Sequence, residues 1–115
     1  MTETKLISYI ITDFISKSEM RMAEISWQDI INKYSEKFKK AGALRQTISR
    51  IWDKDNVYRL GHHWEYRDDS AFKECQKIFK LAEKDFKKET GIIWKISSNR
   101  GIVTSETKFS YSNDS

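Results

Sequence analysis

Apolar residues recur at intervals of three and four positions along four stretches of this chain, a spacing that predicts amphipathic helices. The first stretch runs from Lys5 to Lys17, where Leu6, Ile10 and Phe14 belong to one apolar stripe. A polar break follows it, and the next apolar stripe begins at Trp27. The predicted helices cover residues 5–17, 27–41, 43–54 and 71–90.

Local signals mark both ends of the second predicted helix. Ser26 is a candidate N-cap, and Asp29 occupies the position where a capping box normally has Glu or Gln. Lysines fill the last turn, where the helix dipole favours cations, and Gly42 follows as a C-terminal stop. Only a short turn then separates this helix from the next one, which is predicted to start near Ala43.

Shorter runs with alternating or β-branched residues predict strands between the helices. Met20–Ile25 is predicted as a short strand, and Gly61 is predicted to lie in the turn of a first hairpin. The two predicted hairpins pair residues 57–60 with 64–67 and residues 92–96 with 102–104. Together these elements predict an α+β fold that is mostly α.

The predicted helix at residues 43–54 has a polar face with the chemistry to contact DNA. Its apolar stripe consists of Leu44, Ile48, Ile51 and Trp52. The opposite face presents Arg45, Gln46, Ser49 and Arg50. Arginine can donate two hydrogen bonds to guanine, glutamine can pair with adenine, and serine fits a base edge or a phosphate. The alternative is an ordinary surface helix whose polar side chains are only solvated.

Positive charge is concentrated around the same helix. The whole chain has a formal net charge of +4, whereas the window from Lys37 to Arg59 alone contains seven cations and two anions. A basic patch of this kind makes nucleic acid a plausible partner. The cations predicted to attract phosphate independently of base sequence are Lys37, Lys39, Lys40 and Arg59.

The order of elements over residues 4–67 is helix, short strand, helix, turn, helix and hairpin. This order resembles the winged helix-turn-helix family of DNA-binding domains, with a winged-helix-like three-helix core in residues 1–67. In that family's terms, 44–50 is the recognition helix and 58–66 is the wing. The resemblance implies that Arg45, Gln46, Ser49 and Arg50 face the major groove, and that Arg59, His62 and His63 approach a phosphate or the minor groove.

The second half of the chain is predicted as an appendage on this unit. Residues 68–104 form a long helix and a hairpin packed on it, and 105–115 form a flexible tail. The apolar stripe of the long helix consists of Phe72, Cys75, Phe79, Ala82 and Phe86. This stripe packs either on the first helix or on its copy in a homodimer. An internal alternative makes 71–90 the recognition helix and the following hairpin its wing, with Arg100 at the tip.

No constellation of catalytic or metal-binding residues can be assembled from the sequence. His62 and His63 are adjacent, so in a strand they point to opposite faces and do not readily share one metal ion. Cys75 is the single cysteine, and no nucleotide-binding or hydrolase motif occurs. The chain is therefore predicted to be a non-enzyme without cofactor. It lacks a membrane-spanning apolar run and a secretory signal, which predicts a cytoplasmic location.

The sequence thus predicts a small protein that binds double-stranded DNA, either a transcription regulator or a replication accessory factor. The alternative is a virus- or plasmid-encoded adaptor or inhibitor that binds a host protein, because a basic winged helix also fits an acidic protein surface. RNA is a less favoured partner, since the aromatic residues do not form the exposed stacking motif of common RNA-binding sheets.

Overall fold

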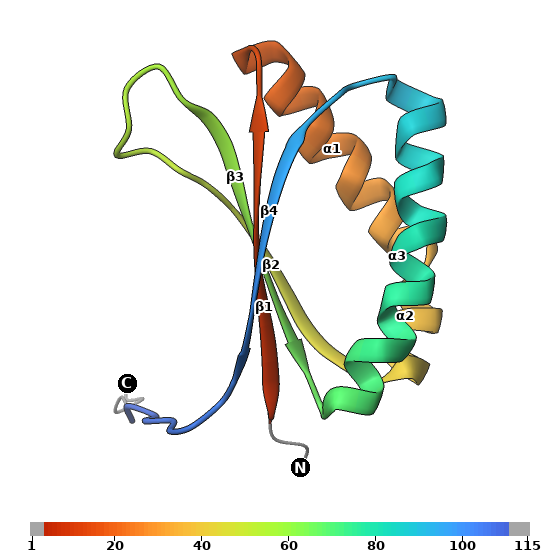
Figure 1. The fold of residues 1–115 in the computed structure, drawn as a ribbon, viewed down its shortest axis with the longest axis vertical. Helices are drawn as coiled ribbons and strands as arrows, with labels where there is room; N and C mark the ends of the chain where they lie inside the picture. Colours follow the sequence, from red (N-terminus) through yellow and green to blue (C-terminus); the bar gives the residue numbers. More distant parts are fainter. Residues whose placement is uncertain (1–3, 111–115) are drawn as a thin grey trace.

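The computed structural model describes residues 4–110 as one sheet with helices on one side (Figure 1). The elements are β1 (Leu6–Phe14), α1 (Lys17–Lys33), α2 (Ser35–Ala41), β2 (Ala43–Arg50), β3 (Tyr58–Tyr66), α3 (Asp69–Thr90) and β4 (Lys95–Ile102). The strands form a four-stranded antiparallel sheet in the order β2-β3-β1-β4. All three helices cover the same face, which leaves the other face of the sheet without a helix.

This architecture corrects the winged-helix prediction. The predicted three-helix core with a short wing is replaced by an α+β fold in which four strands of eight or nine residues form one layer and the helices form the other. Because β4 pairs with β1 along 6–13, the C-terminal part lies in the same sheet as the N-terminus. No helix in the described part of the chain has the length and apolar character needed to cross a membrane.

Residues 6–14 were predicted to form a helix, but they form the central strand β1, which pairs with β3 on one side and β4 on the other. Ser8, Thr12 and Phe14 are buried beneath the helices, whereas Ile7 and Ile11 point to the open face. A strand that carries apolar residues on both faces produces the same three- and four-residue intervals as an amphipathic helix. The β-branched side chains and the two partner strands decide in favour of the strand.

Helix α1 runs without interruption through the predicted strand at 20–25 and the predicted N-cap Ser26, so both predictions are wrong. The helix instead begins after Ser16, whose side chain accepts a hydrogen bond from the backbone N–H of Glu19 at 3.1 Å. Its buried residues are Met20, Ala23, Trp27, Ile30 and Ile31, which recur at helical intervals. The helix continues because this stripe packs against the rest of the core.

The predicted recognition helix is wrong, because Ala43–Arg50 forms strand β2. The stop at Gly42 is confirmed: this residue is the C-cap of α2 with a φ of 106°, in the left-handed region that suits glycine. A Cβ on Gly42 would lie 2.6 Å from the Cβ of Ala71, so the chain also passes close to α3 there. The segment then pairs with β3 instead of starting a helix.

The two predicted hairpins are each a single strand. Strand β3 passes straight through Gly61, which pairs with Ile11 on β1. A Cβ on Gly61 would lie 2.8 Å from the hydroxyl oxygen of Tyr9, so this glycine accommodates a neighbouring side chain and does not form a turn. Strand β4 likewise includes the residues predicted as the second loop, because it pairs with β1 over its whole length.

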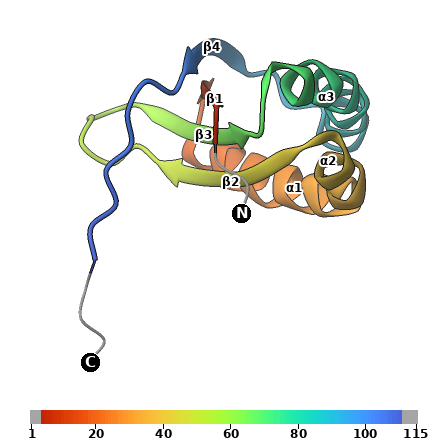
Figure 2. The ribbon, with the colours of Figure 1, turned by 90° about the horizontal axis from the view of Figure 1, so that it is seen from below.

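Helix α3 is the predicted element that the structure confirms most closely. Asp68 caps it by accepting from the backbone N–H of Ala71 at 2.7 Å, and Gly91 ends it with a φ of 66°. Of the two packings predicted for its apolar stripe, the structure shows the one within the chain: the stripe is largely buried in the core, where Phe79 contacts the rings of Phe38 and Trp64. The residues from 103 to 110 form neither helix nor strand and extend past the open side of the sheet (Figure 2); the rest of the predicted tail lies outside the described residues.

Candidate functional site: a pocket between the sheet and helix α3

The residues predicted to bind DNA do not share one surface. In strand β2, Arg45 and Ser49 lie on the open face, whereas Gln46 and Arg50 lie on the helix-covered face. Four of the eight residues have a hydrogen-bond or ion-pair partner among residues 4–110. These contacts are Arg45 to Glu65 at 3.7 Å, Gln46 to Gln28 at 3.2 Å, Arg50 to Glu24 at 2.7 Å and Arg59 to Asp13 at 2.6 Å. Lys37, Lys39 and Lys40 lie on helix α2 and not on the sheet.

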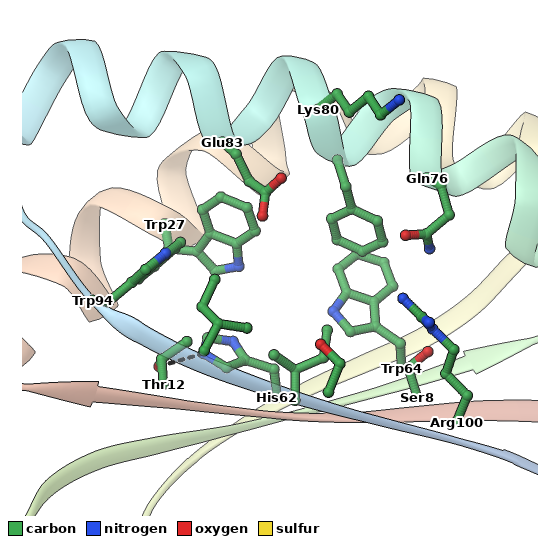
Figure 3. A pocket seen from close by; sticks show the side chains of 14 residues that line it. Ser8, Thr12, Trp27, His62, Trp64, Gln76, Lys80, Glu83, Trp94 and Arg100 are labelled. Atoms are coloured by element: carbon green, nitrogen blue, oxygen red, sulfur yellow. Dashed lines mark hydrogen bonds between the residues drawn. The ribbon is translucent and has the colours of Figure 1, made fainter.

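A pocket of about 210 Å³ lies between the sheet and α3 (Figure 3). Strands β1, β3 and β4 form its floor, α3 forms its roof, and Trp27 and Trp94 lie together at one end. It opens between α3 and β4, where its lining residues are solvent-exposed. The floor residues are Ser8, Ile10, Thr12, His62, Trp64, Ile96, Ser98 and Arg100, and the residues of α3 are Gln76, Phe79, Lys80 and Glu83.

The floor of the pocket is polar, although it lies in the core. Ser8, Thr12 and His62 are the buried polar residues of the described part of the chain, and all three line this pocket. The Nε2 atom of His62 lies 3.1 Å from the hydroxyl of Thr12. Burial lowers the pKa of His62 to about 4, so its imidazole is neutral at pH 7. A neutral imidazole keeps one nitrogen as donor and one as acceptor.

Aromatic rings form the walls. Trp94 stacks on Phe86 at 4.3 Å between ring centroids, and it meets Trp27 edge-on at 5.5 Å. On the other side of the pocket, the rings of Trp64 and Phe79 are 4.7 Å apart. Rings held in this way leave a space with flat apolar sides, which favours a planar apolar ligand.

The indole N–H of Trp64 has no hydrogen-bond acceptor among residues 4–110, although the side chain is 2% exposed. Leaving a buried donor unpaired costs about 1–3 kcal/mol. Figure 3 shows that this nitrogen points into the pocket, toward the space below Glu83. A ligand atom that accepts a hydrogen bond can satisfy it there.

Charged residues lie at the rim. Glu83 is exposed at its outer side, yet partial desolvation raises the pKa of its carboxyl above the usual value. Arg100 extends from β4 toward α3, where its guanidinium lies 4.9 Å from the centre of the Phe72 ring. Within the described residues, neither Arg100 nor Lys80 forms an ion pair with a carboxylate.

Analysis of the sequence missed this site. The prediction that His62 and His63 point to opposite faces is confirmed, since His62 lines the pocket and His63 lies on the open face, 3.8 Å from Glu65. The usable signal was the pair of polar residues Ser8 and Thr12, four positions apart and therefore on the same face of a strand, in a largely apolar run. Among the residues described, no group of three His, Cys, Asp or Glu side chains could hold a metal ion.

Comparison with known families gives one match over most of the chain. The family described as Domain of unknown function (DUF6974) matches residues 3–103. No curated protein matches this chain in sequence.

Solved structures share the whole fold. A dimeric ferredoxin-like protein from an uncultured marine organism is 26% identical with a TM-score of 0.83, covering 92% of this chain and 100% of its own. A second protein of the same description is 24% identical with a TM-score of 0.76, covering 91% and 100%. A monooxygenase of Streptomyces coelicolor, solved with Nanaomycin D, is 8% identical with a TM-score of 0.60, covering 93% and 94%.

These likenesses overturn the predicted function. The fold is ferredoxin-like, and the segment assigned to recognise DNA is a strand of its sheet. The prediction of a winged-helix transcription regulator that binds double-stranded DNA is therefore wrong. The alternative, a virus- or plasmid-encoded adaptor that binds a host protein, also depended on a winged helix. This alternative is therefore wrong as well.

Proposed function

This chain belongs to the family described as Domain of unknown function (DUF6974), and from its pocket we propose that it binds a small planar aromatic molecule. The ligand lies between the sheet and α3, with its ring against Trp27 and Phe79. Burial of flat apolar surface supplies most of the affinity. As in the sequence-based prediction, the protein in this proposal binds the molecule and does not catalyse a reaction on it.

The observation that carries the proposal is the unpaired indole N–H of Trp64. A carbonyl or hydroxyl oxygen on the ligand accepts this hydrogen bond, and the cost of the buried donor is removed on binding. The polar floor beside it, with Ser8 and His62, supplies further hydrogen-bonding groups. A pocket lined with aromatic rings and a few convergent polar groups is the usual form of a small-molecule site.

Coumarin is a suitable first probe, because it is neutral and planar and carries a carbonyl acceptor. We expect it to quench tryptophan fluorescence in a saturable way, with the dissociation constant then measured by calorimetry. Trp64→Phe keeps an aromatic ring but removes the donor, and we expect it to weaken binding about fivefold to tenfold. Trp52→Phe is the matched control, since Trp52 is 90% exposed and lies outside the pocket. Absence of coumarin binding at millimolar concentration would contradict the proposal.

A second candidate function is catalysis on the bound molecule. Two titratable side chains face the pocket, a neutral His62 and Glu83 with its raised pKa, and such groups can accept a proton from a ligand. Two proteins with this fold are described as an antibiotic biosynthesis monooxygenase and a putative one, although at 11–13% identity the likeness is one of fold. Dioxygen consumption with a bound hydroxyaromatic compound tests this candidate: consumption abolished by Glu83→Gln supports it, and no consumption contradicts it.

We also propose that the open face of the sheet packs against a second copy of the chain. Ile7, Tyr9 and Ile11 lie side by side along β1 on this face, and no helix covers them (Figure 1). Two relatives at 24% and 26% identity are described as dimeric. An isologous dimer would bury this apolar strip on both copies.

For the location of the protein we propose the cytoplasm. Cys75 is a buried free thiol on α3, and burial raises its pKa to about 11, so it stays protonated and unreactive. A lone reduced cysteine suits a reducing compartment.

A further inference from the structure

We infer that the ligand is a hydroxylated aromatic acid, with a carboxylate at the Arg100 end of the pocket and a hydroxyl group at the Glu83 end. This rests on the aromatic-ligand function proposed above and deepens it. The hydroxycinnamates are the class with this layout: one ring, a flat unsaturated arm that ends in a carboxylate, and a hydroxyl opposite the arm.

The cationic end is built by β4 and α3. Figure 3 shows that Arg100 extends upward from the sheet and that its guanidinium lies near the side-chain amide of Gln76, with Lys80 above. Phe72 holds the guanidinium from one side through its ring. Because Arg100 has no carboxylate partner among the described residues, its donors are free for an anion, and a guanidinium binds a carboxylate with two parallel hydrogen bonds.

The opposite end is acidic and accepts hydrogen bonds. Glu83 extends down from α3 beside Trp27, and His62 and Thr12 lie on the floor below it (Figure 3). Glu83 forms no ion pair with any lysine or arginine in the part of the chain that the structure describes. A hydroxyl group here can donate to the carboxyl oxygen of Glu83, whereas a ligand carboxylate would be repelled. The ligand is therefore oriented by charge.

The spacing of the two ends suits one ring with a short arm. Gln76 and Glu83 are seven residues apart on α3, so their Cα atoms are roughly 10 Å apart along the helix axis. Between them the rings of Phe79 and Trp64 touch edge-on, with centroids 4.7 Å apart, so the arm of the ligand passes along their edges on the open side of the pocket and not between them. The indole N–H of Trp64 points toward the space below Glu83 (Figure 3), so the hydroxyl oxygen of the ligand can accept from it while the hydroxyl hydrogen is donated to Glu83.

Calorimetric titration of the full chain with four probes tests this inference. The probes are 4-hydroxycinnamate, cinnamate without the hydroxyl, 4-hydroxycinnamyl alcohol without the carboxylate, and neutral coumarin. We expect 4-hydroxycinnamate to bind about tenfold more tightly than the alcohol, and several-fold more tightly than cinnamate. Arg100→Gln should remove the advantage of the acid over the alcohol while coumarin binding is kept.

Matched variants separate the two ends. Glu83→Met removes the acceptor and should cancel the preference for 4-hydroxycinnamate over cinnamate. Glu89→Met is the matched control on the same helix, and because Glu89 lies outside the pocket this variant should keep that preference. Lys95→Gln is the control for Arg100→Gln, because Lys95 is exposed on β4 and lies outside the pocket.

The outcomes are distinguishable. If coumarin binds but the acid has no advantage, or the advantage survives Arg100→Gln, the hydroxylated-acid inference is overturned while the aromatic-ligand function stands. If coumarin does not bind at millimolar concentration, the aromatic-ligand function is overturned, and the hydroxylated-acid inference that rests on it is overturned too.

Discussion

The two faces of the sheet use the same strands for different purposes. On the helix-covered face, the even-numbered residues of β1 and β3 combine aromatic rings with three buried polar side chains around a pocket. On the open face, the odd-numbered residues form an apolar strip beside ion pairs such as Arg59 with Asp13. A strand directs alternate side chains to opposite sides, so the residues of one face can differ in polarity and charge from those of the other.

The helix-covered face carries the stability of the monomer, and the open face contributes little to it. Rings such as Phe86 and Trp64 are almost fully buried between the layers, whereas the open-face residues of β1 are only half-buried. Half-buried apolar residues side by side are typical of an interface. Substitutions on the two faces should therefore affect different measurements.

The largest effect on the free energy of unfolding is expected from Phe86→Ala. Phe86 is 2% exposed and contacts both Trp27 and Trp94, so its removal leaves a cavity in the core. We expect a loss of about 3–5 kcal/mol, measured by urea unfolding. Phe109→Ala is the control, because Phe109 is 75% exposed, and a comparable loss there would contradict the assignment of the core.

The next largest effect concerns pH and the two adjacent histidines. The pKa of His62 is about 4 in the folded chain and near 6.5 when unfolded, so the unfolded chain binds the proton more strongly. Stability from this group is therefore full above pH 6.5 and is lost as pH falls toward 4, by about 3 kcal/mol in total. Unfolding curves from pH 7 to pH 4 should show this loss in the natural chain and in His63→Gln, which changes the open face. The unfolding curves of His62→Gln should not show this loss of stability. Equal pH dependence in the natural chain and in both variants would refute the prediction.

An intermediate effect is expected on the proposed dimer, with little change in the monomer. Ile11→Lys places a charge in the middle of the open face, which should raise the dissociation constant at least about 100-fold, because a buried unpaired charge is costly. Light scattering after gel filtration gives the oligomeric state. Ile15→Lys is the control, since Ile15 is 82% exposed just beyond β1. A natural chain that is monomeric at high concentration would exclude this interface.

The smallest effect is expected from the ion pairs. Arg59 donates to both oxygens of Asp13, at 2.6 Å and 3.2 Å, but both side chains are about one-third exposed, so solvent screens the pair. Asp13→Asn should cost less than about 1 kcal/mol in urea unfolding. Glu24→Gln removes the partner of Arg50 near the helices, and its effect should be equally small. A loss of several kcal/mol in either variant would show that these contacts are more than surface pairs.

The pocket could have been anticipated only in part. Ser8 and Thr12 interrupt an apolar run, which indicates a polar patch in the core, and the alternation of His62 and His63 was deduced correctly. What brings them to Glu83 and Arg100 is the pairing of β1 with β3 and β4 and the position of α3 over the sheet. No local pattern encodes that arrangement, because the residues lie in segments up to about ninety positions apart.

By itself, the sequence determined the features that depend on neighbouring residues. Helix α3 and the glycine stop at Gly42 follow from helical spacing, charges near the ends and backbone freedom, which all act within a turn or two. The tertiary structure alone decided that 6–14 and 43–50 are strands. A strand is stabilised by distant partners across the sheet, so a pattern compatible with both helix and strand is resolved only when those partners are in place.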